Sequence, residues 1–137
     1  MARLHVVAVS ARLPAWAEAA CAEYASRMPK GYEVSRIAVK DGTQLEKSLA
    51  KLKRVSIVAL DERGKDMTTE QFAALLSEAA VFVIGGPDGL DEKLKNEAKI
   101  LLRLSSLTLP HALAQLVLLE QIYRAATLLT GHPYHRM

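Results

Sequence analysis

The sequence predicts an α/β protein with a mostly parallel sheet covered by helices on both faces, in one domain over residues 1–137. Strand-length apolar runs alternate with amphipathic helical patterns along the whole chain. Strands that alternate with helices are typical of a parallel sheet covered on both faces. A chain of 137 residues can bury one core, and we find no internal repeat, linker or low-complexity segment.

The strands follow from the apolar runs. Residues 4–10 (LHVVAVS) form a buried first strand, and residues 32–39 (YEVSRIAV) alternate apolar and polar side chains as in a half-exposed strand. Residues 55–61 (VSIVALD) and 81–86 (VFVIGG) are apolar and end in polar residues or glycines. Residues 102–110 (LRLSSLTLP) form a further extended, mostly apolar run.

The helices lie between these strands. The first begins at Pro14 and ends before Pro29, and Thr68 with Gln71 has capping-box spacing at the start of a helix over 69–79. The other helices are expected over 43–53, 91–100 and 111–130. Residues 61–67 (DERGKDM) are expected to form a polar loop, and charged residues of the 91–100 helix, Lys95 among them, to face water.

Composition narrows the class of protein. The single cysteine, Cys21, excludes an intrachain disulfide and a cysteine zinc site; we expect it to be a small buried apolar residue in a reducing cytoplasm. The apolar run near the N-terminus is short and is broken by His5, Arg12 and Pro14, so we do not expect a signal peptide. No stretch approaches the length of a membrane span. The net charge of +3 suits RNA as a partner and suits an ordinary soluble surface equally.

The last predicted helix is apolar almost all round, which is typical of a helix buried on two sides. In a domain of this size such burial predicts a homodimer built partly on this helix. Polar residues at Gln115, Glu120, Gln121 and Arg124 interrupt the run and argue against a membrane span. The apolar positions are Leu113, Leu116, Val117, Leu118, Leu119, Ile122, Tyr123, Ala126, Leu128 and Leu129.

Ligands of parallel sheets gather at the carboxyl ends of the strands. Three predicted ends carry candidate residues, at positions 60–61, 85–86 and 109–110. IGGPDG, at the second, has neither dinucleotide-fingerprint nor P-loop spacing. Its glycines either leave backbone amides open to a ligand or form a tight turn, with Pro87 presetting φ and Gly89 at positive φ. Asp61 and Glu62 either lie near a cofactor or belong to a solvated loop.

LSSLTLPH and the C-terminal GHPYHRM carry the remaining chemistry. Ser105 or Ser106 with His111 could form a hydrolytic triad, but no Gly-x-Ser-x-Gly surrounds either serine. His111, His132 and His135 lack the tight spacing of zinc ligands, so no metal is expected. The tail is interpreted as a polar hook for a nucleic acid or as a segment docked on the partner subunit purely for stability. In the hook, Tyr134 would stack on a base and Arg136 would bind a phosphate.

Taken together, ALDERGKDMTTEQFA, FVIGGPDGL, LSSLTLPH, LLEQIYRA and GHPYHR, with LHVVAVSARLPAWAEAACAEYASRMP, resemble the RlmH-type methyltransferases of the SPOUT class. The resemblance implies a C-terminal trefoil knot, a dimer and S-adenosylmethionine as cofactor. It also implies methylation of N3 of pseudouridine 1915 in 23S ribosomal RNA, and we expect the substrate to be the assembled ribosome. Carried over by position, the cofactor contacts are Leu60, Gly85, Leu104, Ser105, Ser106, Leu107, Thr108 and Leu109.

The same resemblance implies that the tail, from the partner subunit, completes the substrate pocket. Tyr134 and Arg136 would position the base, and His135 and His111 would handle the N3 proton or orient the base. The chain departs from the family by being shorter and by carrying Gln115 where an arginine is usual. Two alternatives are a catalytically silent dimeric RNA- or ribosome-binding protein on the same scaffold and a flavodoxin-like nucleotide-binding domain. The second lacks a glycine after the first strand (VSARLPAW).

Overall fold

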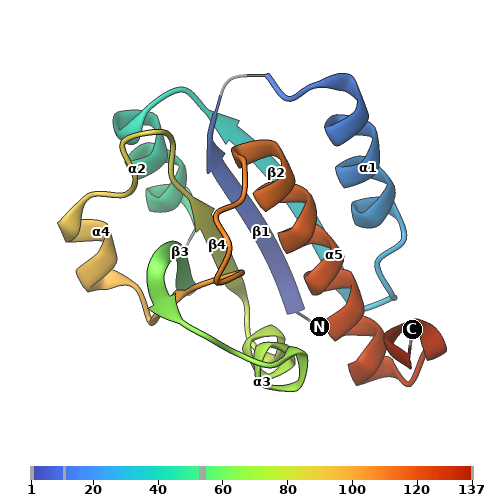
Figure 1. Ribbon diagram of the computed structural model, residues 1–137. Helices are drawn as coiled ribbons and strands as arrows, with labels where there is room; N and C mark the ends of the chain where they lie inside the picture. The colour runs from blue at the N-terminus through green and yellow to red at the C-terminus, as the bar shows by residue number, and fades with distance from the viewer. Residues whose placement is uncertain (1, 11, 53–54, 137) are drawn as a thin grey trace.

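A five-stranded sheet, parallel throughout, forms the centre of the molecule, in the order β2-β1-β4-β3-β5 (Figure 1). The computed structural model describes residues 2–10, 12–52 and 55–136. The predicted α/β class is confirmed, and the sheet is fully parallel where a mostly parallel one was expected. The strands are β1 (Ala2–Val9), β2 (Tyr32–Val39), β3 (Ser56–Lys65), β4 (Ala80–Ile84) and β5 (Ile100–Leu102).

Helices cover both faces of this sheet, as expected. α1, α3 and α5 pack on one face, and α2 and α4 on the other (Figure 1). The helices are α1 (Ala15–Ser26), α2 (Gly42–Lys51), α3 (Thr69–Ala73), α4 (Glu92–Glu97) and α5 (His111–Thr130), with 3₁₀ turns η1 (Ala74–Ser77) and η2 (Pro133–Arg136).

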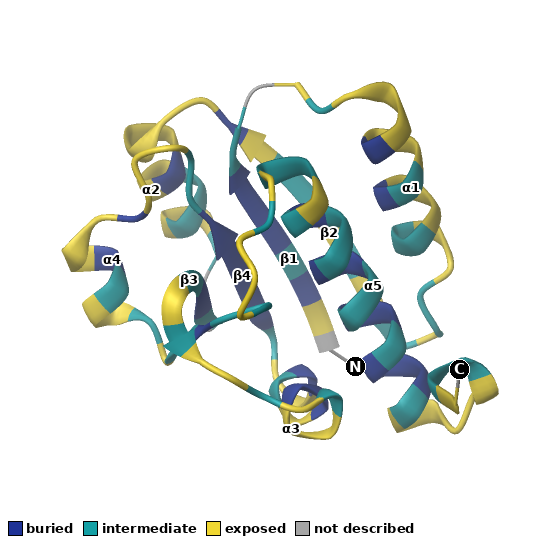
Figure 2. Ribbon diagram, in the orientation of Figure 1, coloured by how far each residue is buried: buried dark blue, intermediate teal, exposed yellow. Residues whose placement is uncertain are grey.

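The central strands are buried on both faces because their side chains alternate between two apolar clusters (Figure 2). In β4, Phe82 packs under α3 and α5, whereas its neighbours Val81 and Val83 pack toward α2 and α4. Phe82 and Phe72 of α3 place their ring centroids 5.5 Å apart. Cys21 is fully buried in the larger cluster, as predicted, and this burial raises the pKa of its thiol.

Several predicted boundaries move. The polar stretch 61–65, expected to be a loop, continues β3, because its backbone pairs with β5 at Lys65. The helix expected over 69–79 ends at Ala73 and becomes the 3₁₀ turn η1, although the capping box of Thr68 and Gln71 is present as predicted. The helix expected over 91–100 stops at Glu97. The last residues of the helix expected over 43–53 lie partly outside the described residues.

The prediction that no stretch approaches a membrane span is wrong by length and hydropathy, since α5 is long and apolar enough to cross one. Its most apolar side, with Leu118, Leu119 and Ile122 fully buried, covers the sheet as the central helix of the core. A core helix passes the same test of length and composition as a membrane span. We therefore assign α5 to the core.

Candidate active site

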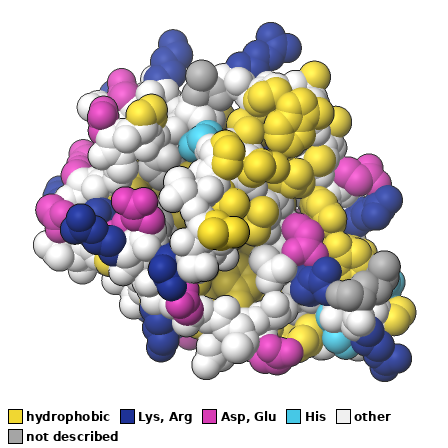
Figure 3. All heavy atoms as spheres, viewed as in Figure 1, with side chains coloured by type: hydrophobic (Ala, Val, Ile, Leu, Met, Phe, Trp, Pro, Cys, Tyr) yellow, Lys and Arg dark blue, Asp and Glu magenta, His cyan; other side chains and the backbone are white. Residues whose placement is uncertain are grey.

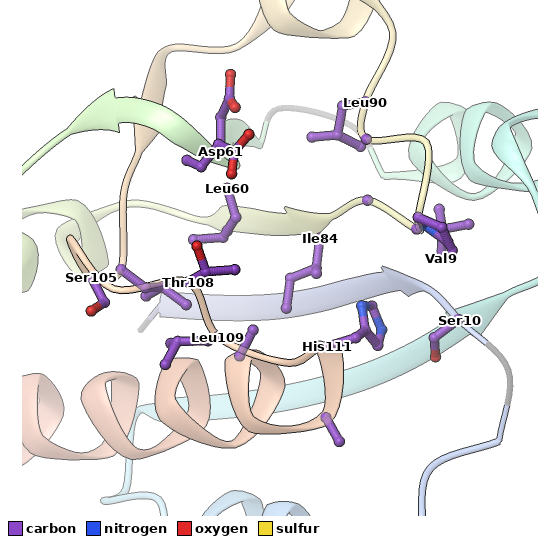
Figure 4. A pocket seen from close by; sticks show the side chains of 18 of the residues that line it. Val9, Ser10, Leu60, Asp61, Ile84, Leu90, Ser105, Thr108, Leu109 and His111 are labelled. Carbon is purple, nitrogen blue, oxygen red and sulfur yellow. The ribbon is translucent and has the colours of Figure 1, made fainter.

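A cavity of about 680 Å³ opens at the carboxyl edge of the sheet. Figure 4 shows side chains from strand ends and from the start of α5 lying around one space. Four strands contribute residues here: Val9 ends β1, Leu60 and Asp61 lie in β3, Ile84 ends β4 and Leu102 ends β5. The segment after β5 closes the remaining side. The site therefore lies where parallel α/β sheets bind ligands.

Seven of the eight predicted cofactor residues line this cavity; Ser106, although described, does not. The third strand end lies at Leu102, not near Leu109, so residues 103–110 form a loop that carries most of these positions. Within this loop the backbone N–H of Leu107 donates to Ser105 Oγ at 2.9 Å, which fixes a tight bend. The seven lining residues are Leu60, Gly85, Leu104, Ser105, Leu107, Thr108 and Leu109.

The IGGPDG segment is both a tight turn and a wall of the cavity. The backbone N–H of Gly89 donates to the Gly86 carbonyl at 2.9 Å, and Gly89 has the positive φ of 73° that was predicted for it. A Cβ at Gly85 would lie 2.8 Å from the Gly89 carbonyl carbon. The tight-turn interpretation is therefore confirmed, and the tightness of the turn explains why position 85 lacks a side chain.

The chain after β5 lies inside a curve of β3. Leu102 pairs with Leu60 and also with Lys65, so the intervening residues bend around the end of β5. A Cβ at Gly64 would lie 2.7 Å from the backbone of Leu102. Arg103 extends this contact, because its backbone N–H donates to the Lys65 carbonyl at 3.0 Å. Leu102 and Arg103, which line the cavity, are thus held against the backbone of β3.

Charged side chains stand at the edge of the cavity. Lys95, expected to face water, instead pairs with Asp61 at 3.3 Å and lines the cavity. Glu62 lines it as well, so the interpretation of this acidic pair as near a ligand site agrees with the geometry. Arg103 binds Asp66 with two hydrogen bonds of 2.7 and 2.6 Å, which lower the pKa of the Asp66 carboxyl.

Sequence reasoning missed the contribution of the first strand. Ser10, Arg12 and Pro14 follow β1 and line the cavity. The signal was available: a buried strand in a parallel sheet must end at the same edge as its neighbours. The segment was not predicted as part of the site because no glycine follows this strand.

His111, the first residue of α5, lines the cavity from the helix side. Its Nε2 lies 2.8 Å from the side-chain nitrogen of Gln115, one turn along the helix. That nitrogen is also 3.4 Å from Ser10 Oγ. Partial burial lowers the pKa of the His111 imidazole below its ordinary value, which favours the neutral ring.

The C-terminal tail lies at the other end of α5, in the red part of Figure 1. It forms the 3₁₀ turn η2 (Pro133–Arg136). The Tyr134 hydroxyl donates to Glu120 Oε2 at 3.0 Å and lies 3.2 Å from the Tyr24 hydroxyl. Its ring packs edge-on against Tyr123, with centroids 4.6 Å apart, and beneath the Arg124 guanidinium. The tail is thus docked on its own chain.

This docking separates the predicted catalytic residues. A helix of 20 residues is about 30 Å long, and none of the described tail residues 132–136 lines the cavity. Burial, together with the bonds to Tyr24 and Glu120, raises the pKa of Tyr134, so its hydroxyl stays neutral. His135 is half-buried and Arg136 is exposed to solvent. Within one chain, only His111 of the four predicted catalytic residues reaches the cavity.

Among the described residues, His111 is hydrogen-bonded to Gln115 and not to Ser105 or Ser106, as a hydrolytic triad would require. The Ser105 hydroxyl oxygen accepts a bond from its own loop. No group of three or more His, Cys, Asp or Glu residues in the described part of the chain is placed to hold a metal ion.

Apolar surface gathers over α1 and the first turns of α5, beside the cavity (Figure 3). Trp16 of α1 is 56% exposed and Leu113 of α5 is 38% exposed. Leu107, in the loop after β5, is 76% exposed. Large exposed apolar residues close to one another mark a surface suited to contact with another molecule.

Comparison with known proteins extends this description. The family model described as "Predicted SPOUT methyltransferase" matches residues 2–135. The "Ribosomal RNA large subunit methyltransferase H" of Polynucleobacter asymbioticus is 43% identical, over 98% of this chain and 99% of that protein. The protein of the same name from Verminephrobacter eiseniae is 42% identical, with the same coverage of both chains.

Solved structures share the fold. A putative RNA methyltransferase from Bacillus anthracis superposes with a TM-score of 0.60 at 17% identity, covering 90% of this chain and 94% of that one. The SpoU methyltransferase AviRb from Streptomyces viridochromogenes, solved with AdoMet, gives a TM-score of 0.52 at 15% identity, covering 90% and 57%. The sheet, the cavity at its carboxyl edge and the full-length match lead to one assignment: the chain belongs to the ribosomal RNA large subunit methyltransferase H family of SPOUT methyltransferases.

Proposed function

We propose that this protein transfers a methyl group from S-adenosylmethionine to N3 of pseudouridine 1915 in 23S ribosomal RNA, on the assembled ribosome. Family membership supports the reaction. The observation that carries the proposal is the cavity at the carboxyl edge, where seven of eight expected cofactor positions meet.

The residues of the cavity fit S-adenosylmethionine. A volume of about 680 Å³ is within the range of small-ligand sites. Leu60, Ile84 and Leu104 give an apolar wall for an adenine ring, and the carboxylates of Asp61 and Glu62 are suited to the positive charges of the ligand. When bound, this cofactor supplies an electrophilic methyl group on a sulfonium sulfur.

The C-terminal trefoil knot is part of the same proposal. The chain after β5 would pass through the loop that β3 begins. The curve of residues 60–65 around Leu102, with the close backbone contact at Gly64, supports this path. Such a path would hold the 103–110 loop from both sides and keep the cavity shaped before a ligand arrives.

A homodimer would complete the site. The tail and the cavity of one chain lie at opposite ends of α5, so the tail that reaches a cavity must come from a second chain. Trp16 and Leu113 offer an apolar surface beside the cavity for that second chain. A two-fold arrangement would give two equal sites, each using the cavity of one chain and the tail of the other.

In the completed site each residue has a defined task. Arg136, exposed and cationic, would bind a phosphate or a base oxygen. Tyr134 would fix the turn that presents His135 and Arg136, and its raised pKa argues against a role as proton acceptor. His111 would orient the base over the cavity as the N3 proton leaves. Together these contacts would align N3 with the reacting methyl group.

The reaction is tested with methyl-labelled S-adenosylmethionine. Assembled ribosomes, free large subunits and naked 23S RNA from a strain lacking the modification are compared, and the labelled nucleotide is mapped. We expect label at N3 of that pseudouridine on assembled ribosomes only. Cofactor binding without label on any substrate would contradict the proposal and favour the catalytically silent ribosome-binding protein.

The divided site is tested by mixing two inactive variants. A chain ending at Gly131 lacks the tail, and Thr108→Trp places a large side chain in the cavity (Figure 4). Each alone should be inactive. After mixing and re-equilibration, half of the dimers are hybrids with one intact site, so roughly a quarter of wild-type activity should return. No recovery, with hybrids present, would show that tail and cavity do not act across chains.

A further inference from the structure

Gln115 is a buried polar residue in the apolar helix α5. It is 5% exposed, and among the described residues only Thr127 is a second polar residue with comparable burial. A buried amide loses its hydration and must find partners in the protein. The partners of Gln115 belong to the cavity: His111 lies one turn before it, and Ser10 directly follows β1.

The direction of these hydrogen bonds follows from the Gln115 atom that faces both partners, the amide nitrogen. The Gln115 side-chain nitrogen lies 2.8 Å from His111 Nε2 and 3.4 Å from Ser10 Oγ. An amide nitrogen only donates, so both partners must accept. His111 Nε2 can accept only with its lone pair, which requires the neutral ring with its proton on Nδ1.

We infer that Gln115 is a positioning residue that holds His111 as a neutral imidazole protonated on Nδ1, so that His111 serves the cavity as a hydrogen-bond donor. The lone pair that could take a proton is already used by Gln115. This inference rests on the proposed function. It means that His111 orients the base by donating to a base oxygen, and that a group other than His111 accepts the N3 proton.

Protonation of His111 would oppose this arrangement. The imidazolium has an N–H on both nitrogens, and the Nε2–H would face the amide N–H at 2.8 Å. Burial of the ring acts in the same direction. The charged groups that line the same cavity are Arg12, Asp61, Glu62, Lys95 and Arg103, and three of these are paired, Asp61 with Lys95 and Arg103 with Asp66.

The test is nitrogen-15 NMR of His111 in the wild-type protein, which requires no ribosomes and no turnover. We expect the spectrum of the Nδ1–H tautomer. Gln115→Met removes the donor at similar volume and should raise the pKa of His111 by about half to one unit, the effect of losing one neutral hydrogen bond. Gln115→Glu supplies an acceptor instead and should raise it by more than one unit. Thr127→Val, a buried polar change further along α5, should leave it unchanged.

Kinetics separate positioning from simple support of the fold. Gln115→Met should lower kcat by about tenfold with the KM for ribosomes unchanged, because the base is bound but less well oriented. An Nε2–H tautomer in the wild type, or a fall in the pKa of His111 in Gln115→Met, would overturn the inference even if Gln115 variants fold poorly. Absence of methylation by the wild type would refute the proposed function and leave the NMR result standing.

Discussion

Gly64→Ala tests the close crossing of β3 and β5. The added Cβ would lie 2.7 Å from the Leu102 carbonyl carbon, 2.8 Å from the Leu101 carbonyl carbon and 2.8 Å from its oxygen. Ordinary contact begins near 3.4 Å, so the two backbones must separate by about 0.7 Å, the difference between 3.4 and 2.7 Å. These neighbours are backbone atoms and cannot rotate away.

The cost follows from two terms and one offset. Overpacking costs about 1–3 kcal/mol. Weakening the bond from the Arg103 N–H to the Lys65 carbonyl costs about 1 kcal/mol more. Alanine also reduces the conformational freedom of the unfolded chain, which offsets about 0.4–1 kcal/mol of this loss of stability. The free energy of unfolding should therefore fall by about 1–3.6 kcal/mol, and with an m-value of about 2 kcal/mol/M the urea midpoint should fall by about 0.5–1.8 M.

Gly42→Ala is the matched control. It makes the same chemical change at the first residue of α2, where nothing lies within 4 Å of the new Cβ. Its urea midpoint should stay the same or rise, because this substitution adds at most about 0.4–1 kcal/mol to the free energy of unfolding. Urea denaturation followed by circular dichroism measures both. If Gly64→Ala unfolds at the wild-type midpoint, the contact we describe does not constrain the chain.

Three further predictions use other parts of the molecule. Tyr134→Phe removes the hydroxyl that donates to Glu120, so the free energy of unfolding should fall by about 1 kcal/mol. Methyl transfer should also fall, while cofactor affinity, measured by calorimetry, stays constant. Arg12→Glu changes an arginine that lines the cavity, and it should raise the KM for ribosomes without changing cofactor affinity. The slope of log KM against log salt concentration should become shallower by about one unit. An unchanged slope would show that Arg12 does not contact the RNA. The hydrogen bonds from Arg36 lower the pKa of the Glu18 carboxyl, so the stability that this pair provides is present above the ordinary value of 4.5 and is lost as the pH falls below it. Because Glu18 is 56% exposed, Glu18→Gln should cost less than about 1 kcal/mol at pH 7 and nothing at pH 3, and equal effects at both values would refute the coupling.

Side-chain patterns predicted the fold wherever burial decides structure. The apolar runs around Val6 and Phe82 gave the central strands, and the Thr68–Gln71 spacing gave a helix start, because these signals are local. The continuation of β3 through residues 61–65 was hidden, since its charged side chains look like a loop and only the backbone of β5 makes it a strand. The shortening of α3 was hidden for a similar reason, as nothing in its composition marks the change to 3₁₀ geometry.

The candidate site was predicted in the same uneven way. Strand ends placed Leu60 and Gly85 at one edge, and the resemblance to a known family added the loop after β5. Arg12 was missed because it follows a strand that ends without glycine, although that strand is central in the sheet. His111 and Gln115 are four residues apart in one predicted helix, so their contact follows from helical spacing. The contact of Gln115 with Ser10 depends on how this helix packs against the end of β1, which no sequence pattern encodes.

The length of α5 has a consequence for how much protein a cell must make. If a working site needs the cavity of one chain and the tail of another, a solitary chain has no activity at all. The specific activity then depends on concentration: it is constant well above the dissociation constant of the pair and falls in proportion to concentration well below it. A drop in expression would then reduce methylation by a larger factor than it reduces the number of chains. Dilution alone would inactivate the enzyme without any inhibitor.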